Sequence, residues 1–318
     1  MKRIILALAA LALTASQALA AWPDRPIRVF TTSSAGGISD IFMRVLNDAL
    51  RPSLGQPLII ENKPGGAGNI AARACQDAPP DGYTICIINA DTMIYNQYLF
   101  KSLSFDPEKG LVPIVNLFHL IQVLAVNSDL HAKTVDELVA ASKARPGTLS
   151  YLTASIPCVV YMERLKKEKG ADWVRVPFRG GGEAVTAILG GTTPIGLLGL
   201  GNLTSYIKGG RMTALALVNN KRTPLLPDVP TWADLGYTGA ASETWYGLFA
   251  PAGTPKEVID RINAEVQRVF ADKAFVDKYV ISRGQVPAVN SPEEFAHEIA
   301  ADRVGAKDVV KESGLEQQ

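Results

Sequence analysis

The sequence predicts an α/β protein of two domains whose sheets are mostly parallel. Three observations favour this architecture. The chain has 318 residues, more than a single domain usually holds. Short runs rich in β-branched residues alternate with segments whose apolar residues recur at helical spacing. Glycine-rich turns join several of these runs to the helix that follows, as strand–helix units of α/β folds require.

The first half of the chain alternates between the two kinds of segment. Its predicted strands are 27–31, 57–61, 84–89 and 123–127. Its predicted helices are 39–51, a segment ending near residue 77 and a segment ending at residue 145. Pro52 and Pro146 stand where the first and last of these helices must stop. Thr134 and Glu137 form a capping-box pattern, because the hydroxyl and the carboxylate can each satisfy an unpaired amide at a helix start.

The alternation continues through the second half. The predicted strands are 149–153, 173–178, 194–198, 214–218 and 244–249. The predicted helices are 158–169, a segment opened by the glycines at 180–182, 203–208, 256–270 and 292–310. We expect the strand at 244–249 to return to the first domain.

The N-terminus has the pattern of a secretory signal peptide. Lys2 and Arg3 precede an apolar run at 4–13, and Ala-Leu-Ala at 18–20 supplies a cleavage pattern. We therefore expect residues 1–20 to be removed and the mature protein to be exported. No later stretch is long and apolar enough to cross a bilayer, so no direct membrane anchor is expected.

The predicted mature chain is almost neutral. Without Lys2 and Arg3 it has 30 basic and 31 acidic residues, a formal charge of −1. Proteins that bind nucleic acid or anionic lipid usually have an excess of basic residues. The predicted mature chain has no such excess, so neither partner is expected. The three histidines stand in unrelated contexts and no G-x-S-x-G motif occurs, so we expect no metal site, cofactor or catalytic residue.

The three cysteines are Cys75, Cys86 and Cys158. An odd number leaves at least one unpaired in an oxidising compartment. A bridge between Cys75 and Cys86 is conceivable, since one belongs to a predicted helix and the other to the next predicted strand. The interpretation favoured here is three buried thiols that act as small apolar residues.

Three glycine-rich turns follow predicted strands, after Thr31, Glu61 and Phe178. Glycine lets a ligand approach the main chain, and the next helix offers unpaired amides. That combination binds phosphate or carboxylate without a charged side chain. Each turn alone is equally consistent with a tight connection, but three of one kind favour an anion site.

One of these turns also matches a dinucleotide fingerprint. Residues 66–71 read G-x-G-x-x-A, and Asp91 follows roughly 20 residues later. The match is short and lies in the second strand–helix unit rather than the first. A nicotinamide cofactor is also not expected outside the cytoplasm, so we do not interpret this motif as an oxidoreductase signature.

Several longer segments together resemble a known family. They read WPDRPIR at 22–28, AGGISD at 35–40, ENKPGGAGNI at 61–70, PDGYT at 80–84, VPFRGG at 176–181, LLPDVPT at 225–231 and GLFAPAGTP at 247–255. In this order they resemble the Bug family, the extracytoplasmic receptors of tripartite tricarboxylate transporters. The resemblance covers essentially the whole predicted mature chain.

This resemblance implies a two-domain periplasmic binding protein fold with a hinge of crossing strands. Domain I is expected at 21–124, completed by 247–318, and domain II at 125–246. We expect a periplasmic monomer. Its expected function is to capture a small carboxylate in the cleft between the domains and pass it to membrane transporter subunits. A dicarboxylate or an aromatic carboxylate is the favoured ligand.

The resemblance also places the ligand contacts on turns at the strand ends. In the first domain these are Ser33, Ser34, Ala35, Gly36, Gly37, Asp40, Asn89, Asp91 and Thr92. In the second domain they are Thr153, Ser155, Phe178, Arg179, Gly180, Gly181 and Asn202. Residues 35–37 are expected to present amides and Asp40 to hold their loop. Arg179 could grip a carboxylate with two bonds or lie exposed at a strand end.

The chain departs from the family pattern at the predicted site. Hydroxyl residues at 31–34 stand where relatives carry apolar residues and prolines, and Gly182–Glu183 replaces Ala-Pro. Trp245 and Phe178 could stack on an aromatic ligand, although core packing is favoured for both. Two alternative functions remain open, a secreted α/β enzyme acting on a small carboxylate and a receptor that signals to a sensor domain.

Overall fold

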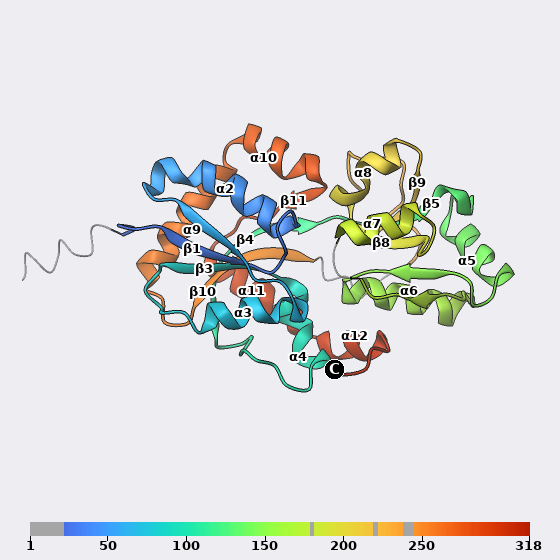
Figure 1. Ribbon diagram of the computed structural model, residues 1–318, viewed down its shortest axis with the longest axis horizontal. Helices are drawn as coiled ribbons and strands as arrows, with labels where there is room; N and C mark the ends of the chain where they lie inside the picture. Colours follow the sequence, from blue (N-terminus) through green and yellow to red (C-terminus); the bar gives the residue numbers. More distant parts are fainter. Residues whose placement is uncertain (1–21, 179–180, 219–221, 238–243) are drawn as a thin grey trace, which may run out of the picture.

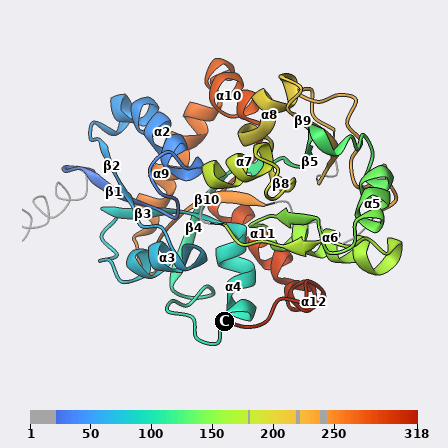
Figure 2. The same cartoon turned by 45° about the vertical axis from the view of Figure 1, so that its right-hand side comes forward.

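The computed structural model describes residues 22–178, 181–218, 222–237 and 244–318. The predicted signal peptide lies outside these residues. Figures 1 and 2 show two lobes, each built around one sheet that is covered by helices. The predicted α/β class is therefore confirmed.

The first lobe is built on a six-stranded sheet in the order β11-β4-β10-β3-β1-β2. Its strands are β1 (Ile27–Thr31), β2 (Leu58–Asn62), β3 (Thr84–Asn89), β4 (Leu111–Leu120), β10 (Trp245–Pro251) and β11 (Gln285–Pro287). Its helices are α2 (Ile38–Leu54), η2 (Gly66–Gly68), α3 (Asn69–Gln76), η3 (Asp91–Tyr95), α4 (Asn96–Leu99), α9 (Lys256–Phe270), α10 (Lys273–Tyr279), η5 (Ile281–Arg283), α11 (Pro292–Arg303) and α12 (Ala306–Glu312).

The second lobe is built on a five-stranded sheet in the order β7-β6-β8-β5-β9. Its strands are β5 (Gln122–Asn127), β6 (Ser150–Leu152), β7 (Val174–Arg175), β8 (Ile195–Gly199) and β9 (Met212–Leu217). Its helices are η4 (Ser128–Leu130), α5 (Val135–Ala144), α6 (Ile156–Lys169), α7 (Gly181–Leu189) and α8 (Leu200–Lys208).

Both sheets are mixed, where the sequence predicted mostly parallel pairing. In the first sheet β1 pairs in parallel with β2 and β3, but β10 lies antiparallel between β3 and β4. In the second sheet β6 pairs in parallel with β7 and β8, but β5 lies antiparallel between β8 and β9. The antiparallel strands are the ones that carry the chain from one lobe to the other, and local sequence patterns carry no information on their direction.

Ile121 joins the two sheets. It follows β4 of the first sheet and precedes β5 of the second. Its amide donates to Gly284 O at 3.1 Å in the first lobe, and its carbonyl accepts from Leu200 N at 2.7 Å in the second. The chain returns to the first sheet through β10, where Leu120 N donates to Thr244 O at 2.8 Å. These are the crossing strands that the resemblance implies. The predicted domain boundaries remain a prediction.

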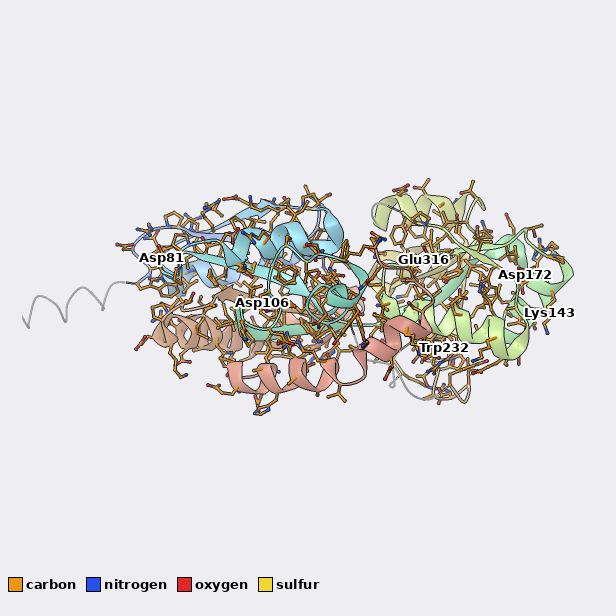
Figure 3. The ribbon with its side chains drawn as sticks, turned by 90° about the horizontal axis from the view of Figure 1, so that it is seen from below. Asp81, Asp106, Lys143, Asp172, Trp232 and Glu316 are labelled. Atoms are coloured by element: carbon orange, nitrogen blue, oxygen red, sulfur yellow. A yellow bond between two sulfur atoms is a disulfide. The ribbon has the colours of Figure 1, made fainter. Side chains whose placement is uncertain are left out.

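Each sheet has an apolar core on both of its faces. In β1, Val29 packs with α2 and α9 on one face, while Phe30 packs with α3 and α11 on the other. The second sheet is enclosed in the same way by α5 and α6 on one face and α7 and α8 on the other. Trp232 lies within the second lobe (Figure 3), where its ring stacks on Tyr161 at a centroid distance of 4.5 Å.

Cys75 on α3 and Cys86 on β3 form a disulfide. The sequence interpretation of three free thiols is therefore wrong for this pair. The helix packs directly on the strand, which brings the two Cα atoms to 6.1 Å. Cys158 is the remaining thiol and is buried.

The predicted helix at 292–310 is two helices, α11 and α12. Gly305 adopts φ +79° between them, a conformation that breaks a right-handed helix. Because of this turn, α12 packs against α6 of the other lobe, where Glu312 forms a salt bridge with Arg164. Within the described ranges, no helix combines the length and apolar character needed to cross a membrane.

Candidate ligand-binding site

The loop between β1 and α2 is held by a buried carboxylate. Asp40 accepts from Gly36 N at 2.9 Å and from Arg44 Nε at 3.0 Å. Asn62, at the end of β2, donates to Asp40 Oδ1 and to Ser33 O at 3.0 Å each. Burial opposes ionisation of Asp40, but the bonds from Arg44, Gly36 and Asn62 outweigh it and hold the pKa of the carboxyl below its usual value. Asp40 thus organises the loop, as the sequence analysis predicted.

The amides of this loop differ from the expected open cradle. Gly36 N donates to Asp40, and Gly37 N donates to Ser34 O at 2.9 Å. Ser39 N lies 3.3 Å from the Ser33 hydroxyl, which also contacts the hydroxyl of Ser39. Gly36 and Gly37 therefore use their amides within the loop, because its turn and the Asp40 side chain supply local acceptors. Ser34 and Ala35 remain exposed at its tip.

Asn62 was not predicted from the sequence, and it offers a direct test of how the loop is held. Asn62→Ala removes the hydrogen bonds from this side chain to Thr31 Oγ1, Ser33 O and Asp40. The backbone amides of Gly36 and Gly37 should therefore exchange hydrogen faster. The free energy of unfolding should fall by about 1–3 kcal/mol. Hydrogen-exchange mass spectrometry measures this effect.

Asn47→Ala is the matched control, because Asn47 accepts from Leu58 N at 2.7 Å in the middle of α2, away from the loop at the start of this helix. It should destabilise the lobe without accelerating exchange at 36–37. Equal acceleration by both variants would show that Asn62 does not hold the loop.

The second glycine-rich turn packs inside the first lobe. A Cβ on Gly68 would lie 2.3 Å from Thr92 Oγ1, and Gly68 has φ +91°. The Thr92 hydroxyl lies 2.9 Å from Ala67 O and 2.7 Å from Asn89 Oδ1, and the side chain is buried. Asn96 also donates to Ala67 O at 2.9 Å. The glycine here permits close packing, and Thr92 is committed to that packing.

The loop after β3 reaches the other lobe through Asp91. Its Oδ1 accepts from the amide of Ile156, the first residue of α6, at 3.1 Å. Its Oδ2 lies 3.4 Å from Asn89 Nδ2. The structure therefore brings the predicted residues Asn89 and Asp91 together with the turn that contains Thr153 and Ser155.

Hydroxyl groups line the turn before α6. Ser155 N donates to Thr153 Oγ1 at 3.2 Å, and Ser155 Oγ lies 3.4 Å from Thr244 Oγ1 beside the crossing strands. Gln122 donates to the same Thr244 hydroxyl at 3.1 Å and faces Cys158 Sγ at 2.6 Å. Burial raises the pKa of the Cys158 thiol to about 12, so this cysteine is not a nucleophile at neutral pH.

Arg175 is a charged residue that contacts this turn, and sequence reasoning missed it. Its Nη2 donates to Thr153 O at 3.4 Å, and its buried Nε has no hydrogen-bond partner among the described residues. The side chain lies at the end of β7, one strand from the turn. The signal available in the sequence was a basic residue within the predicted strand at 173–178, two positions before Pro177.

A second contact joins the lobes at the start of α2. A Cβ placed on Gly199 would lie 3.8 Å from Ile38 Cδ1 and 3.8 Å from Asn202 Nδ2. Ile38 opens α2 in one lobe, and Gly199 ends β8 in the other. The first loop therefore faces the predicted 199–202 turn.

The remaining predicted residues divide into three cases. Phe178 is partly buried and packs against the core of the second lobe. Trp245 is buried and donates to Asp302 Oδ2 at 2.7 Å, so core packing, the role favoured from the sequence, is confirmed for it. Arg179 and Gly180 lie outside the described residues, and Gly181 opens α7.

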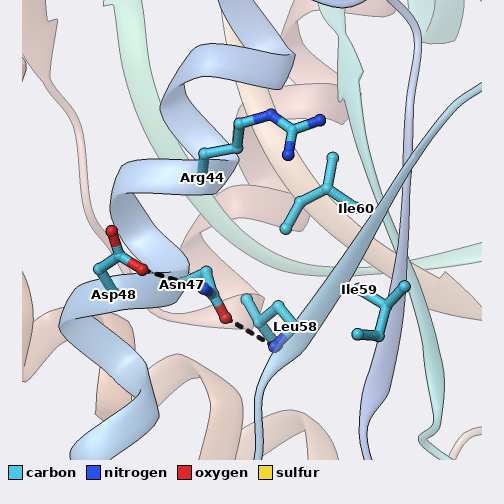
Figure 4. Close-up of a pocket in the computed structure, with 6 residues that line it drawn as sticks. All are labelled: Arg44, Asn47, Asp48, Leu58, Ile59 and Ile60. Carbon is cyan, nitrogen blue, oxygen red and sulfur yellow. Dashed lines mark hydrogen bonds between the residues drawn. The ribbon is translucent and has the colours of Figure 1, made fainter.

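A shallow hollow of about 380 Å³ lies elsewhere on the first lobe (Figure 4). Its lining residues are Arg44, Asn47, Asp48, Leu58, Ile59 and Ile60. They come from the middle of α2 and the start of β2, and none is a predicted ligand contact. In the described part of the chain, no group of His, Cys, Asp or Glu side chains could hold a metal ion.

Several known proteins are similar to this chain along most of its length. The family model described as "Tripartite tricarboxylate transporter family receptor" matches residues 42–315. Protein BugT of Bordetella pertussis is 29% identical over 296 residues, which cover 92% of this chain and 90% of BugT.

Two solved structures with bound carboxylates are similar along nearly the whole chain. The R. palustris protein Rpa4515, solved with adipate, has a TM-score of 0.86 and 25% identity, and covers 93% of this chain and 100% of its own. MatC from Rhodopseudomonas palustris, solved with malate, has a TM-score of 0.80 and 26% identity, and covers 91% of this chain and 100% of its own.

Proposed function

This chain belongs to the Bug family of receptors for tripartite tricarboxylate transporters, and we propose that it captures a small carboxylate between its two lobes for delivery to a membrane transporter. Solute binding is the role of the family, and its receptors are periplasmic. Export through the signal peptide at 1–20 is part of the proposal.

The observation that carries the proposal is the meeting of loops from both sheets. Asp91 of the first lobe binds Ile156 N of the second, and Ile38 of the first approaches Gly199 of the second. In open α/β sheets, ligands bind at the carboxyl ends of strands, which is where these loops lie. The bound adipate and malate of the two similar structures support a carboxylate as the ligand here.

We assign the ligand contacts to the exposed or part-exposed groups around this junction. They are Ser33, Ser34, Ala35, Asn89, Asp91, Arg175, Phe178 and Asn202. The buried residues Asp40, Thr92, Thr153 and Ser155 hold these loops in place. The lobes move about Ile121 and β10, so that domain I (21–124 with 247–318) closes on domain II (125–246).

A thermal-shift screen of residues 21–318 against aliphatic and aromatic carboxylates tests the function. A ligand that binds only the folded state must raise the melting temperature. We expect selective stabilisation by one class of carboxylate and confirmation by calorimetry. Chemical turnover of the bound carboxylate would contradict a receptor and support an enzyme.

Gly37→Ala should weaken carboxylate binding by about tenfold or more, because a Cβ at residue 37 would lie 2.4 Å from Ser33 Cβ and displace the loop. Gly305→Ala is the control for general destabilisation. Gly305 has φ +79° with open space around it, so alanine costs about 1–2 kcal/mol there, at the turn between α11 and α12 and outside the first loop. Unchanged affinity in Gly37→Ala would remove the first loop from the site.

A further inference from the structure

The Asp91 carboxylate lies between the lobes, and no cation lies beside it within the ranges that the structure describes. Its oxygens face two nitrogen donors, Ile156 N at 3.1 Å and Asn89 Nδ2 at 3.4 Å. Among the described residues, burial is the main influence on its ionisation, and only the backbone amides of Ile156 and Asp91 itself oppose it. Asp91 is nevertheless partly exposed, so it retains access to the space between the lobes.

Asp40 is a buried carboxylate of the same lobe whose charge is balanced by a cation. Asp40 binds Arg44 Nη2 at 2.8 Å, and its pKa is lowered despite its burial. Burial raises the pKa of Asp91 to about 6, because no cation balances its charge in the described part of the chain. At neutral pH Asp91 is therefore mostly ionised, and its charge is stabilised poorly.

The opposite charge stands on the other side of the same turn. Arg175 Nη2 donates to Thr153 O, whereas Asp91 Oδ1 accepts from Ile156 N, three residues further along. No ion pair joins Asp91 to Arg175 among the described residues. The turn from 153 to 156 is thus flanked by one carboxylate and one guanidinium, each with unused hydrogen-bonding capacity.

A ligand bound at this turn would lie near both side chains, because each of them contacts the backbone of the turn. A carboxylate beside Asp91 would be disfavoured by like charge, whereas a cationic nitrogen would supply the missing partner. A carboxylate beside Arg175 would gain charge-assisted hydrogen bonds. A ligand with both groups satisfies the two side chains at once, and an unsubstituted dicarboxylate satisfies only one.

We propose that Asp91 and Arg175 are specificity-determining residues and that the ligand is an amino carboxylate, with its cationic nitrogen at Asp91 and its carboxylate at Arg175. This inference rests on the proposed function, since it assumes that a carboxylate binds between the lobes. It goes further by excluding simple dicarboxylates as the preferred class.

Calorimetry on matched ligand pairs tests the inference. The pairs are succinate with β-alanine, glutarate with γ-aminobutyrate, and terephthalate with para-(aminomethyl)benzoate. In the first two pairs an ammonium group replaces one carboxylate at the same position. In the third pair an aminomethyl group replaces it, because an amine bonded directly to the ring would not be protonated at neutral pH. For the pair of suitable length, the wild-type protein should bind the amino member more tightly by about tenfold or more.

Three variants separate the contributions. Asp91→Asn keeps the shape and an acceptor for Ile156 N, and it should abolish or reverse the preference for the amino member. Arg175→Gln should weaken the binding of both members of a pair and leave the ratio of their dissociation constants unchanged. Asp172→Asn is the control, because Asp172 also accepts a backbone amide, Gly147 N at 3.0 Å, but lies on the outer part of the second lobe (Figure 3).

The outcomes distinguish the inference from the proposed function. Preference for the amino member in the wild type, lost in Asp91→Asn and kept in Asp172→Asn, supports the inference. If dicarboxylates bind and Asp91→Asn leaves the ratio of the two dissociation constants in each pair unchanged, the inference is overturned and the receptor function is left intact. Failure of the wild type to bind any carboxylate, in this set or in the thermal-shift screen, overturns both.

Discussion

Replacing both bridged cysteines, by Cys75→Ala with Cys86→Ala, should lower the free energy of unfolding by about 3 kcal/mol. The bridge joins residues 11 positions apart, and closing a loop of this length removes about that much conformational freedom from the unfolded chain. Both side chains are buried in the core between α3 and β3, so alanine adds no polar group there. Urea unfolding of the two proteins under oxidising conditions measures the difference.

Reduction supplies the control for this experiment. A reductant should bring the wild-type unfolding midpoint close to that of the double variant and leave the variant almost unchanged. Cys158→Ala should keep the full response to reductant, because this thiol is buried and unbridged. A wild-type midpoint that does not respond to reductant would show that the bridge contributes nothing to stability.

The sequence predicted the elements whose signals are local. The strands at β1 and β3 have the predicted bounds, because β-branched residues fill both runs. Thr134 caps α5 as expected, accepting from Glu137 N at 3.1 Å. The Glu137 carboxylate accepts from Lys133 N rather than from the capping residue, a shift of one position. Such interactions depend on neighbours within a few residues, so a single sequence reveals them.

Strand β4 shows why other elements were missed. It contains Pro113, Asn116 and His119, which do not favour a buried strand. The polar groups of Asn116 bind residues far away in the sequence: Asn116 N donates to Asn290 Oδ1 at 3.0 Å, and Asn116 Nδ2 donates to Glu298 Oε2 at 2.9 Å. The antiparallel direction of β10 is equally non-local, because its partner strands precede it by more than 100 residues.

The candidate site could likewise be predicted only in part from the sequence. The resemblance indicated which loops face each other, and Asp40 could be assigned to its loop from its position at the start of the predicted helix 39–51. That Asn62 and Arg175 contact these loops depends on tertiary contacts between residues far apart in the sequence. The absence of a cation beside Asp91 among the described residues is likewise a property of the fold.

Asp91→Asn should raise the free energy of unfolding at pH 7 by about 3 kcal/mol in the absence of ligand. Burial raises the pKa of Asp91 from 3.8 to about 6, and that difference corresponds to about 3 kcal/mol. Between these values the folded protein binds more protons than the unfolded chain, so the wild type loses stability as pH rises from about 4 to about 6. Asparagine removes this loss and retains an acceptor for Ile156 N.

In the described part of the chain, two titratable groups respond to the charge of Asp91, and both stay neutral over this range. Burial, with a smaller effect of the Asp91 charge, raises the pKa of Tyr246 on β10 and that of Cys158 on α6, the latter to about 12. The gain in the free energy of unfolding from Asp91→Asn should therefore follow the titration of Asp91 alone. It should be nearly zero at pH 3.5, grow through pH 5 and stay constant above pH 7. Unfolding curves at these pH values measure it.

Asp40→Asn should show the opposite pH dependence and is the matched control. The pKa of Asp40 is lowered, so its ionised form stabilises the fold above its unfolded value of 3.8, and that contribution is lost as pH falls through the folded pKa. Asparagine at residue 40 should therefore destabilise the protein at pH 7, and the difference should shrink in acid. A loss of stability in Asp91→Asn at pH 7 would mean that Asp91 is compensated by a cation in the folded protein, and the reason for assigning it a cationic ligand group would no longer hold.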